Sequence, residues 1–294
     1  MHFFALTVLT LIAQISSGIA KSGPLTVAYV EVNSNSIDNT ARYQLADGSN
    51  VFDIAIIFAS NMKSNGGRAT WFNNQNVQAV LDNAACEIKP LQEKGIKVVL
   101  SLLGGGSGRG ISNFASSEEA AAFARLAADQ IRLYDLDGID LDDEYAQYGD
   151  NGTPQTNSQS IGWLLQALRK ELPDKLITMY NYGPAGQYLM NVDSSIGSIL
   201  DYAWNPNYGT FDPPLIPGLG KKNLAAASIA IAGTDIGIAQ KLANKTVEEG
   251  YAVYLTYNLA EGDQSQYVGA FAKSLYGQET KYVPFNDDTC CSAA

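Results

Sequence analysis

The sequence predicts an α/β protein in which eight parallel strands close into a single (β/α)8 TIM barrel. Two observations lead to this prediction. Short apolar runs of strand length recur from residue 24 onward, and helix-like segments separate most of them. Strands separated by helices pair in parallel through crossover connections, and eight such repeats with none left over fit a closed barrel. The 294 residues, 46% of them hydrophobic, suffice for one core of this size.

We expect strands, in chain order, at residues 25–33, 52–59, 97–104, 136–144, 176–181, 202–205, 227–232 and 251–259. Helices are expected at residues 76–92, 117–134, 158–171 and 236–249. Ser117 is the expected N-cap of the second helix, and Gly250 is a natural stop for the last. Residues 60–75 are expected to form a long polar loop. The glycine-rich loop that begins at Gly104 would let backbone approach a ligand.

The two ends of the chain differ from the rest. Residues 2–15 are almost entirely apolar and are followed by small residues at 18 and 20, which predicts a signal peptide over residues 1–20, cleaved after Ala20. This run is too short to span a membrane. We therefore expect a secreted, extracellular protein with no membrane association after cleavage. Its catalytic domain is expected over residues 21–283. The tail, residues 284–294, has no apolar pattern with which to dock and is expected to be poorly ordered or trimmed.

Composition excludes several classes of function. The net charge of -11 disfavours binding to nucleic acid or to an anionic membrane, whereas a neutral glycan remains compatible. The single histidine, His2, lies in the signal, which excludes a His-dependent triad or a His-ligated metal in the mature chain. Of the three cysteines, Cys86 could form one bond to the tail, at Cys290 or Cys291. We expect no metal, no cofactor and a monomer.

The fourth strand carries an unusual density of acids for a buried segment. Because strand side chains alternate between faces, Asp140, Asp142 and Glu144 share one face, while Ile139 and Leu141 share the other. Neighbouring carboxylates repel, so at least one must hold a proton near neutral pH, which makes a general acid. A calcium site is the first alternative, although such sites use flexible loops. A solvated edge strand is the second, and the apolar face argues against it.

Polar and aromatic side chains end most of the other strands. In a barrel of parallel strands these ends meet at one mouth. Together they predict a groove that binds polar rings by stacking and amide hydrogen bonds, although each residue could instead be core or a turn former. These candidates are Glu31, Asn33, Tyr180, Asn181, Trp204, Asn205, Tyr254 and Asn258, with Gly104 in the loop after the third strand. That loop could also cradle phosphate, but no P-loop lysine follows it.

Several of these segments resemble a known family. Residues 137–144 resemble the DGxDxDxE signature of glycoside hydrolase family 18, and residues 101–105 resemble its SxGG strand. Residues 142–146, 202–206 and 254–259 look more specifically like the secreted endo-β-N-acetylglucosaminidases of the Endo H type. The resemblance implies a (β/α)8 barrel that cuts between the two core N-acetylglucosamine residues of high-mannose or hybrid N-glycans.

The resemblance also implies roles for the acids. Glu144 would be the general acid, and the 2-acetamido oxygen of the substrate would attack C1 to form an oxazolinium with retained configuration, a substrate-assisted mechanism. Asp142 would bind the acetamido N–H, and Asp140 would share charge or a proton with Asp142. Tyr180 is the first choice for the residue that supports the acetamido carbonyl, and Tyr254 for a sugar platform.

Two departures from the chitinases of that family favour N-glycan as substrate. The sixth strand reads Tyr202-Ala203-Trp204-Asn205 where chitinases commonly have M-x-Y-D, and the eighth lacks their barrel-floor tryptophan. A chitinase remains the first alternative. A non-catalytic barrel lectin or inhibitor is the second, although such proteins usually lose the acid that Glu144 provides.

Two glycosylation sequons begin at Asn151 and Asn244. Pro154 makes the first a poorer acceptor. If a host attaches high-mannose glycans to the chain, the enzyme would meet its own substrate during secretion.

Overall fold

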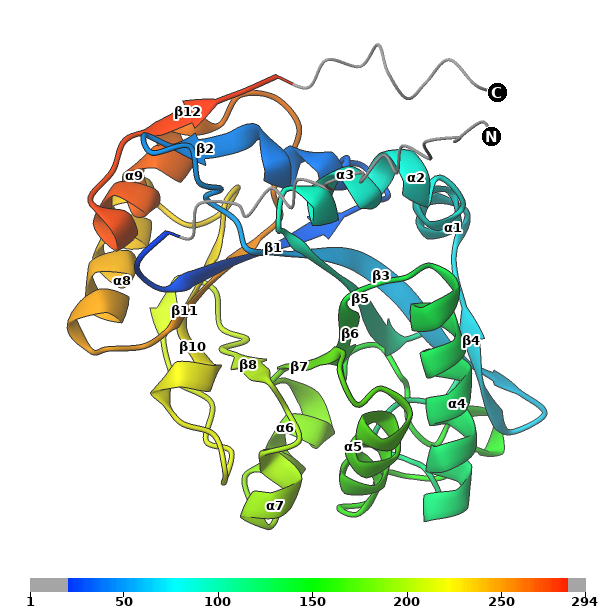
Figure 1. Cartoon of the computed structure of the whole chain (residues 1–294). Coiled ribbons are helices and arrows are strands. Elements are labelled where there is room, and N and C mark those ends of the chain that lie inside the picture. The colour runs from blue at the N-terminus through cyan, green and yellow to red at the C-terminus, as the bar shows by residue number, and fades with distance from the viewer. Residues whose placement is uncertain (1–20, 285–294) are drawn as a thin grey trace, which may run out of the picture.

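The structure, a computed structural model, describes residues 21–284. The predicted signal peptide and residues 285–294 of the predicted tail, with Cys290 and Cys291, lie outside the described residues. The barrel strands are β1 (Leu25–Glu31), β3 (Ile54–Asn65), β5 (Lys97–Gly104), β6 (Gly138–Asp142), β7 (Leu176–Tyr180), β8 (Tyr202–Trp204), β10 (Leu224–Ala230) and β11 (Val253–Tyr257). Because β1 pairs in parallel with both β3 and β11, the eight strands close on themselves, which confirms the predicted barrel (Figure 1).

Helices cover the outside of the barrel (Figure 1). They are α1 (Gln75–Asp82), α2 (Ala84–Glu87), α3 (Lys89–Glu93), α4 (Ser117–Leu133), α5 (Ser160–Glu171), α6 (Gly183–Leu189), α7 (Ser194–Gly197), α8 (Ile236–Glu248) and α9 (Ser265–Tyr276). The single helix expected at 76–92 was wrong, since α1, α2 and α3 divide it. The expected cap of α4 was wrong by one residue, because the Ser116 side chain accepts the Glu119 N–H at 3.3 Å.

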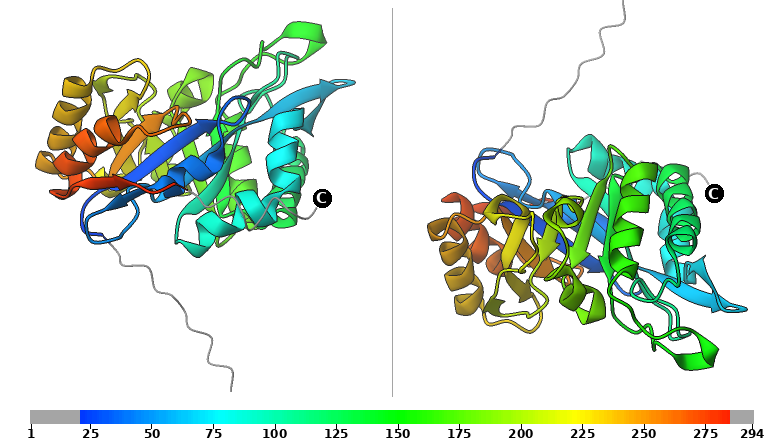
Figure 2. Two further views of the ribbon diagram at one scale, coloured as in Figure 1. Left: turned by 90° about the horizontal axis from the view of Figure 1, so that it is seen from above. Right: turned by 90° about the horizontal axis from the view of Figure 1, so that it is seen from below.

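A β-hairpin replaces the polar loop expected at residues 60–75. Strand β3 runs on to Asn65 and turns at Gly66 and Gly67, both with positive φ, into the antiparallel strand β4 (Arg68–Phe72). The hairpin extends away from the barrel in both views of Figure 2. Its first pair, Asn61 opposite Phe72, lies closest to the barrel, so the hairpin raises one wall beside the ends of the strands.

Two connections carry no α-helix. The 3-10 helix η1 (Ile37–Arg42) and strand β2 (Tyr43–Leu45) follow β1, and β2 pairs with β12 (Thr280–Tyr282) near the end of the described chain. Strand β9 (Thr210–Phe211) and the 3-10 helix η3 (Lys221–Asn223) connect β8 to β10. A further 3-10 turn, η2 (Asp150–Gly152), lies in the connection between β6 and α5.

The apolar side chains pack on both sides of the strands. Inward-facing residues such as Val27, Ile56 and Leu255 fill the barrel, while their outward neighbours pack against the helices. The filled interior leaves the ends of the strands as the place where a ligand can bind. Within residues 21–284, no helix is both long enough and apolar enough to cross a membrane. Cys86 is disulfide-bonded.

Candidate active site

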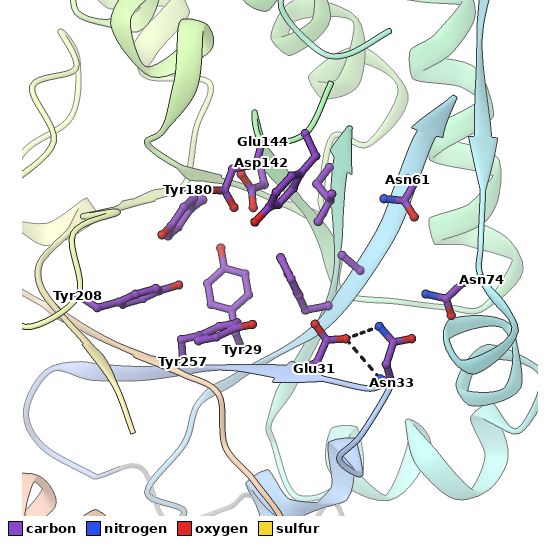
Figure 3. A pocket seen from close by; sticks show the side chains of 14 residues that line it. Tyr29, Glu31, Asn33, Asn61, Asn74, Asp142, Glu144, Tyr180, Tyr208 and Tyr257 are labelled. Carbon is purple, nitrogen blue, oxygen red and sulfur yellow. Dashed lines mark hydrogen bonds between the residues drawn. The ribbon is translucent and has the colours of Figure 1, made fainter. Parts of the chain in front are cut away.

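A cavity of about 450 Å³ opens at the carboxyl ends of the strands (Figure 3). Figure 3 shows Asp142 and Glu144 next to each other on one side of it, and Glu31 with Asn33 across from them. Its lining consists of Tyr29, Glu31, Asn33, Phe58, Ala59, Asn61, Asn74, Leu103, Asp142, Glu144, Tyr145, Tyr180, Tyr208 and Tyr257. The structure therefore places five of the predicted residues in one cavity: Asp142, Glu144, Tyr180, Glu31 and Asn33.

Asp140 lies beneath this cavity and is completely buried. Its Oδ2 accepts hydrogen bonds from the Tyr29 hydroxyl (2.7 Å) and the Ser101 hydroxyl (2.9 Å), and its Oδ1 accepts from Thr178 Oγ1 (2.6 Å) and Trp204 Nε1 (3.0 Å). Burial raises the pKa of Asp140, while these four donors lower it. An ionised carboxylate only accepts hydrogen bonds, so four convergent donors fit the charged form.

Asp142 is the acid whose environment most disfavours charge. Burial raises its pKa well above the ordinary value, and the charges of Glu144, Asp140 and Asp143 raise it further. Its Oδ1 is buried and has no hydrogen-bond partner among the described residues. Asp142 therefore favours the protonated state, and one of its oxygens has no donor from the protein.

Glu144 is half-buried two residues past the end of β6, and its side chain lines the cavity. Burial raises the pKa of its carboxyl, and the neighbouring Asp142 carboxyl lowers it. Two adjacent carboxyls that interact in this way titrate as a pair, so they can hold one proton between them over a range of pH. The pair can thus present one acid and one base to the same ligand.

The glycine-rich loop after β5 holds the segment that carries Glu144. The N–H groups of Gly104, Gly106 and Gly108 donate to the carbonyls of Glu144, Tyr145 and Ala146 at 2.9, 2.9 and 2.8 Å. A Cβ on Gly104 would lie 2.4 Å from the Ala146 nitrogen. The expectation that this backbone approaches a ligand was wrong, because it packs instead against the chain that follows β6.

Five tyrosines line the cavity, Tyr29, Tyr145, Tyr180, Tyr208 and Tyr257, and only Tyr180 was predicted among them. The ring of Tyr208 stacks on Tyr257 at 5.4 Å between centroids, and Tyr29 stands edge-on to Tyr180 at 6.1 Å. The Tyr180 hydroxyl already donates to the Pro206 carbonyl at 2.8 Å. To donate to a substrate carbonyl, as predicted, Tyr180 would have to exchange that bond.

The position predicted for Tyr254 was wrong. Its side chain is fully buried on the outer side of β11, where its hydroxyl donates to the Ala239 carbonyl of α8 at 2.9 Å. The inward residues of β11 are Val253, Leu255 and Tyr257, so Tyr257 takes the place at the cavity. Tyr254 lies on the opposite face of its strand and cannot serve as a sugar platform.

The predicted stacking role of Trp204 and the predicted ligand contact of Asn205 are also contradicted. Trp204 is fully buried inside the barrel and uses its indole N–H to bind Asp140. Asn205 is fully buried, and its amide donates to Thr210 Oγ1 (3.0 Å) and the Ala226 carbonyl (2.8 Å). Asn205 therefore shapes the connection after β8 rather than a groove.

Two further amides lie outside the cavity. Asn258 Oδ1 accepts from the Glu31 N–H at 3.0 Å and from Asn35 Nδ2 at 3.2 Å, so Asn258 fixes the backbone that carries Glu31. Asn181 lines a separate hollow of about 220 Å³ beside Pro206 and Asp212. In the cavity itself the amides are Asn33, Asn61 and Asn74, and the last two belong to residues 60–75, the segment predicted to be a loop.

The described residues contain no group of three or more His, Cys, Asp or Glu side chains that could hold a metal ion. The acids on β6 are instead distributed among separate partners. Asp140 is surrounded by four neutral donors, whereas Asp142 and Glu144 face the cavity.

Comparison with known proteins agrees with this geometry. The model of glycosyl hydrolases family 18 matches residues 25–209, well over half of the chain. An endo-beta-N-acetylglucosaminidase from Flavobacterium sp. (strain SK1022) is 54% identical over 262 residues, which cover 89% of this chain and 83% of that protein. Endo-beta-N-acetylglucosaminidase F1 from Elizabethkingia meningoseptica is 32% identical over 289 residues, which cover 92% and 84%.

Solved structures share the fold. EndoBT-3987 from Bacteroides thetaiotaomicron, in complex with a Man9GlcNAc2Asn substrate, superposes with a TM-score of 0.74 at 25% identity, over 90% of this chain and 68% of that one. A chitinase from Rhizomucor miehei superposes with a TM-score of 0.62 at 14% identity, over 85% and 99%, which indicates the fold alone. The family match and the two sequence relatives show that the chain belongs to glycosyl hydrolase family 18.

Proposed function

We propose that this chain hydrolyses the β-1,4 bond between the two core N-acetylglucosamine residues of high-mannose and hybrid N-glycans. The names of its two sequence relatives and the substrate bound to EndoBT-3987 support this reaction. The observation that carries the proposal is the pair Asp142 and Glu144 in a cavity walled by tyrosines and amides. Such walls suit an uncharged sugar ring, which stacks on aromatic faces and exchanges hydrogen bonds with amides.

In this proposal Glu144 protonates the oxygen of the leaving sugar. Its raised pKa favours the protonated form that a general acid requires, and its half-buried carboxyl reaches the cavity. The nucleophile is the acetamido oxygen of the substrate, which attacks C1 as the glycosidic bond breaks. Glu144, now ionised, then takes a proton from the water that opens the oxazolinium, and the configuration at C1 is retained.

Asp142 orients the acetamido group. Its side chain lines the cavity and can turn the unpartnered Oδ1 toward the acetamido N–H, and its ionised form stabilises the positive charge that develops on the oxazolinium. Asp140 acts on Asp142 through charge, since its two oxygens are occupied by four protein donors. The proton shared by Asp142 and Glu144 therefore passes to Glu144 when the substrate arrives.

We also propose that the chain is secreted. The apolar run at residues 2–15 and the small residues before position 21 support a cleaved signal. N-terminal sequencing of secreted material should begin at Lys21. A secreted species that begins at Met1 would contradict this proposal.

Analysis of released sugars tests the proposed reaction against its chitinase alternative. Purified protein is incubated with a high-mannose glycopeptide and, separately, with chitin oligomers. We expect free glycans that end in one N-acetylglucosamine and little cleavage of chitin. Rapid cleavage of chitin with an intact glycopeptide would favour the chitinase.

A further inference from the structure

The carboxylate of Asp143 points away from the cavity and ties three loops together behind Glu144. Asp143 is 5% exposed. Its hydrogen-bond partners Ser112, Tyr148 and Ala185 do not line the cavity. By strand alternation its side chain faces outward when those of Asp142 and Glu144 face inward. The proposed mechanism does not use this buried carboxylate.

Three donors from three different connections converge on Asp143. Its Oδ2 accepts from the Ser112 hydroxyl (2.6 Å), after β5, and from the Ala185 N–H (2.7 Å), in α6 after β7. Its Oδ1 accepts from the Tyr148 hydroxyl, in the connection after β6. The Tyr148 oxygen in turn accepts the Ser112 N–H at 3.1 Å, which closes the network. One carboxylate thus links the loops that follow β5, β6 and β7.

The main chain is equally constrained at this point. Gly183 has a φ of +66°, and a Cβ there would lie 2.3 Å from the Asp143 carbonyl oxygen. On the other side, Gly104 donates to the Glu144 carbonyl. Residues 143 and 144 are therefore held between the loop after β5 and the start of α6.

From this geometry we infer that Asp143 is a positioning residue, which holds Glu144 in the orientation that proton transfer requires. The inference rests on the proposed function. Proton transfer depends on placement within hydrogen-bond reach, and a displacement of about 1 Å can cost roughly 100-fold in rate. A carboxylate suits the role because it accepts at both oxygens, whereas an amide presents one acceptor.

The test compares Asp143→Asn with Asp137→Asn. Asp137 lies just before β6, at the opposite end of the same strand. Its Oδ2 accepts the Val98 N–H and the Gln92 amide, and its Oδ1 accepts from Lys97 Nζ, all at 2.9 Å. Both variants replace a hydrogen-bonded carboxylate by an amide of the same size. We expect Asp143→Asn to lower kcat by about 10- to 100-fold with KM changed less than about threefold. Asp137→Asn should keep wild-type kcat at a similar loss of thermal stability.

A second measurement separates positioning from folding. In a Glu144→Gln background, Asp143→Asn should bind an uncleaved high-mannose glycopeptide as tightly as Glu144→Gln alone. Ser112→Ala, which removes one of the three donors, should lower kcat by a smaller factor. An unchanged kcat in Asp143→Asn, or equal kcat losses in both Asp→Asn variants, overturns the inference. Failure of the wild-type protein to cleave overturns the proposed function instead.

Discussion

The indole N–H of Trp204 donates a hydrogen bond to Oδ1 of Asp140 across 3.0 Å inside the barrel. This contact makes Trp204 one of the four donors that stabilise the buried Asp140 carboxylate. It also means that the indole ring does not face the substrate cavity. Tyr202 stacks on the same indole at 5.8 Å between centroids.

Trp204→Phe should therefore reduce kcat and leave KM nearly unchanged. The change removes one hydrogen bond to a charged group, worth about 1.5–3 kcal/mol, so a loss of about 10- to 100-fold is expected. Steady-state kinetics on a high-mannose glycopeptide measure it, with Tyr202→Phe as the control that keeps the N–H. A large rise in KM at constant kcat would restore the stacking role.

Gly104→Ala should strongly reduce activity, because the added Cβ displaces the main chain around Glu144. The new Cβ would lie 2.4 Å from both the nitrogen and the Cα of Ala146, and 2.5 Å from the Glu144 carbonyl oxygen. Backbone must shift to relieve these contacts, and Glu144 shifts with it. We expect kcat to fall by about 100-fold or more.

Gly220→Ala is the matched control, because a Cβ at Gly220 meets nothing within 4 Å. It should keep wild-type kcat. Wild-type activity in Gly104→Ala would show that the glycine-rich loop does not fix the position of Glu144.

Asp142→Asn should gain stability relative to wild type as pH rises. The raised pKa means that folded Asp142 binds protons more tightly than unfolded Asp142, whose pKa is about 3.9. Its contribution to stability is full below about pH 4 and is lost as pH rises through the folded pKa. Asparagine does not ionise, so its advantage should grow between pH 4 and neutrality. Melting temperatures of both proteins across this range test the sign, and a difference that does not vary with pH would contradict it.

The same variant should lose hydrolysis while keeping the transfer reaction. A neutral amide does not stabilise the positive oxazolinium, so Asp142→Asn should cleave glycopeptide poorly. A preformed glycan oxazoline bypasses that step, and the variant should still transfer it to an acceptor sugar. Wild-type hydrolysis by Asp142→Asn would rule out substrate assistance.

The sequence pattern predicted that the acids Asp142 and Glu144 line the cavity, but it did not predict correctly which residues of every other strand face inward. Alternation along β6 correctly placed Asp142 and Glu144 at the cavity. It failed on β11, because both faces of a barrel strand are buried and the apolar pattern does not distinguish Tyr254 from Tyr257. Tyr29 could have been found, since it shares a face with Glu31 on β1.

Other features left weaker signals. Asn65-Gly66-Gly67 is a hairpin turn sequence, and it could have revealed the β3–β4 hairpin that supplies Asn61 to the cavity. Tyr208 follows a short strand in an irregular connection, where no periodicity applies. The partners of Asp143 lie 31 and 42 residues away in Ser112 and Ala185, and only the closed barrel brings them together.

Asn244 should carry a trimmed glycan when active enzyme is secreted by a eukaryotic host. Asn244 is exposed in the last part of α8. This part of the helix lies near the amino end of β11, because the Tyr251 N–H donates to the Thr246 carbonyl at 2.9 Å. The cavity lies at the other end of the barrel, so a molecule cannot reach its own Asn244 and trimming must occur between molecules.

Peptide mapping should find a single N-acetylglucosamine at Asn244 in the active enzyme and a full glycan in Glu144→Gln. Addition of active enzyme to purified Glu144→Gln should remove that glycan at a rate proportional to the enzyme added. An intact mannose-bearing glycan on the active enzyme would count against this self-processing.

Intact-mass spectrometry of a high-mannose glycoprotein tests the central claim most directly. The glycoprotein is incubated with wild-type protein or with Glu144→Gln, which keeps the shape of the side chain and removes its acidic proton. The proposed reaction predicts that wild-type protein leaves one N-acetylglucosamine on each glycosylated asparagine. Glu144→Gln should leave the glycoprotein unchanged, because general acid catalysis supplies about 10²–10⁴-fold. Removal of the whole glycan, no cleavage by wild-type protein, or full activity in Glu144→Gln would contradict it.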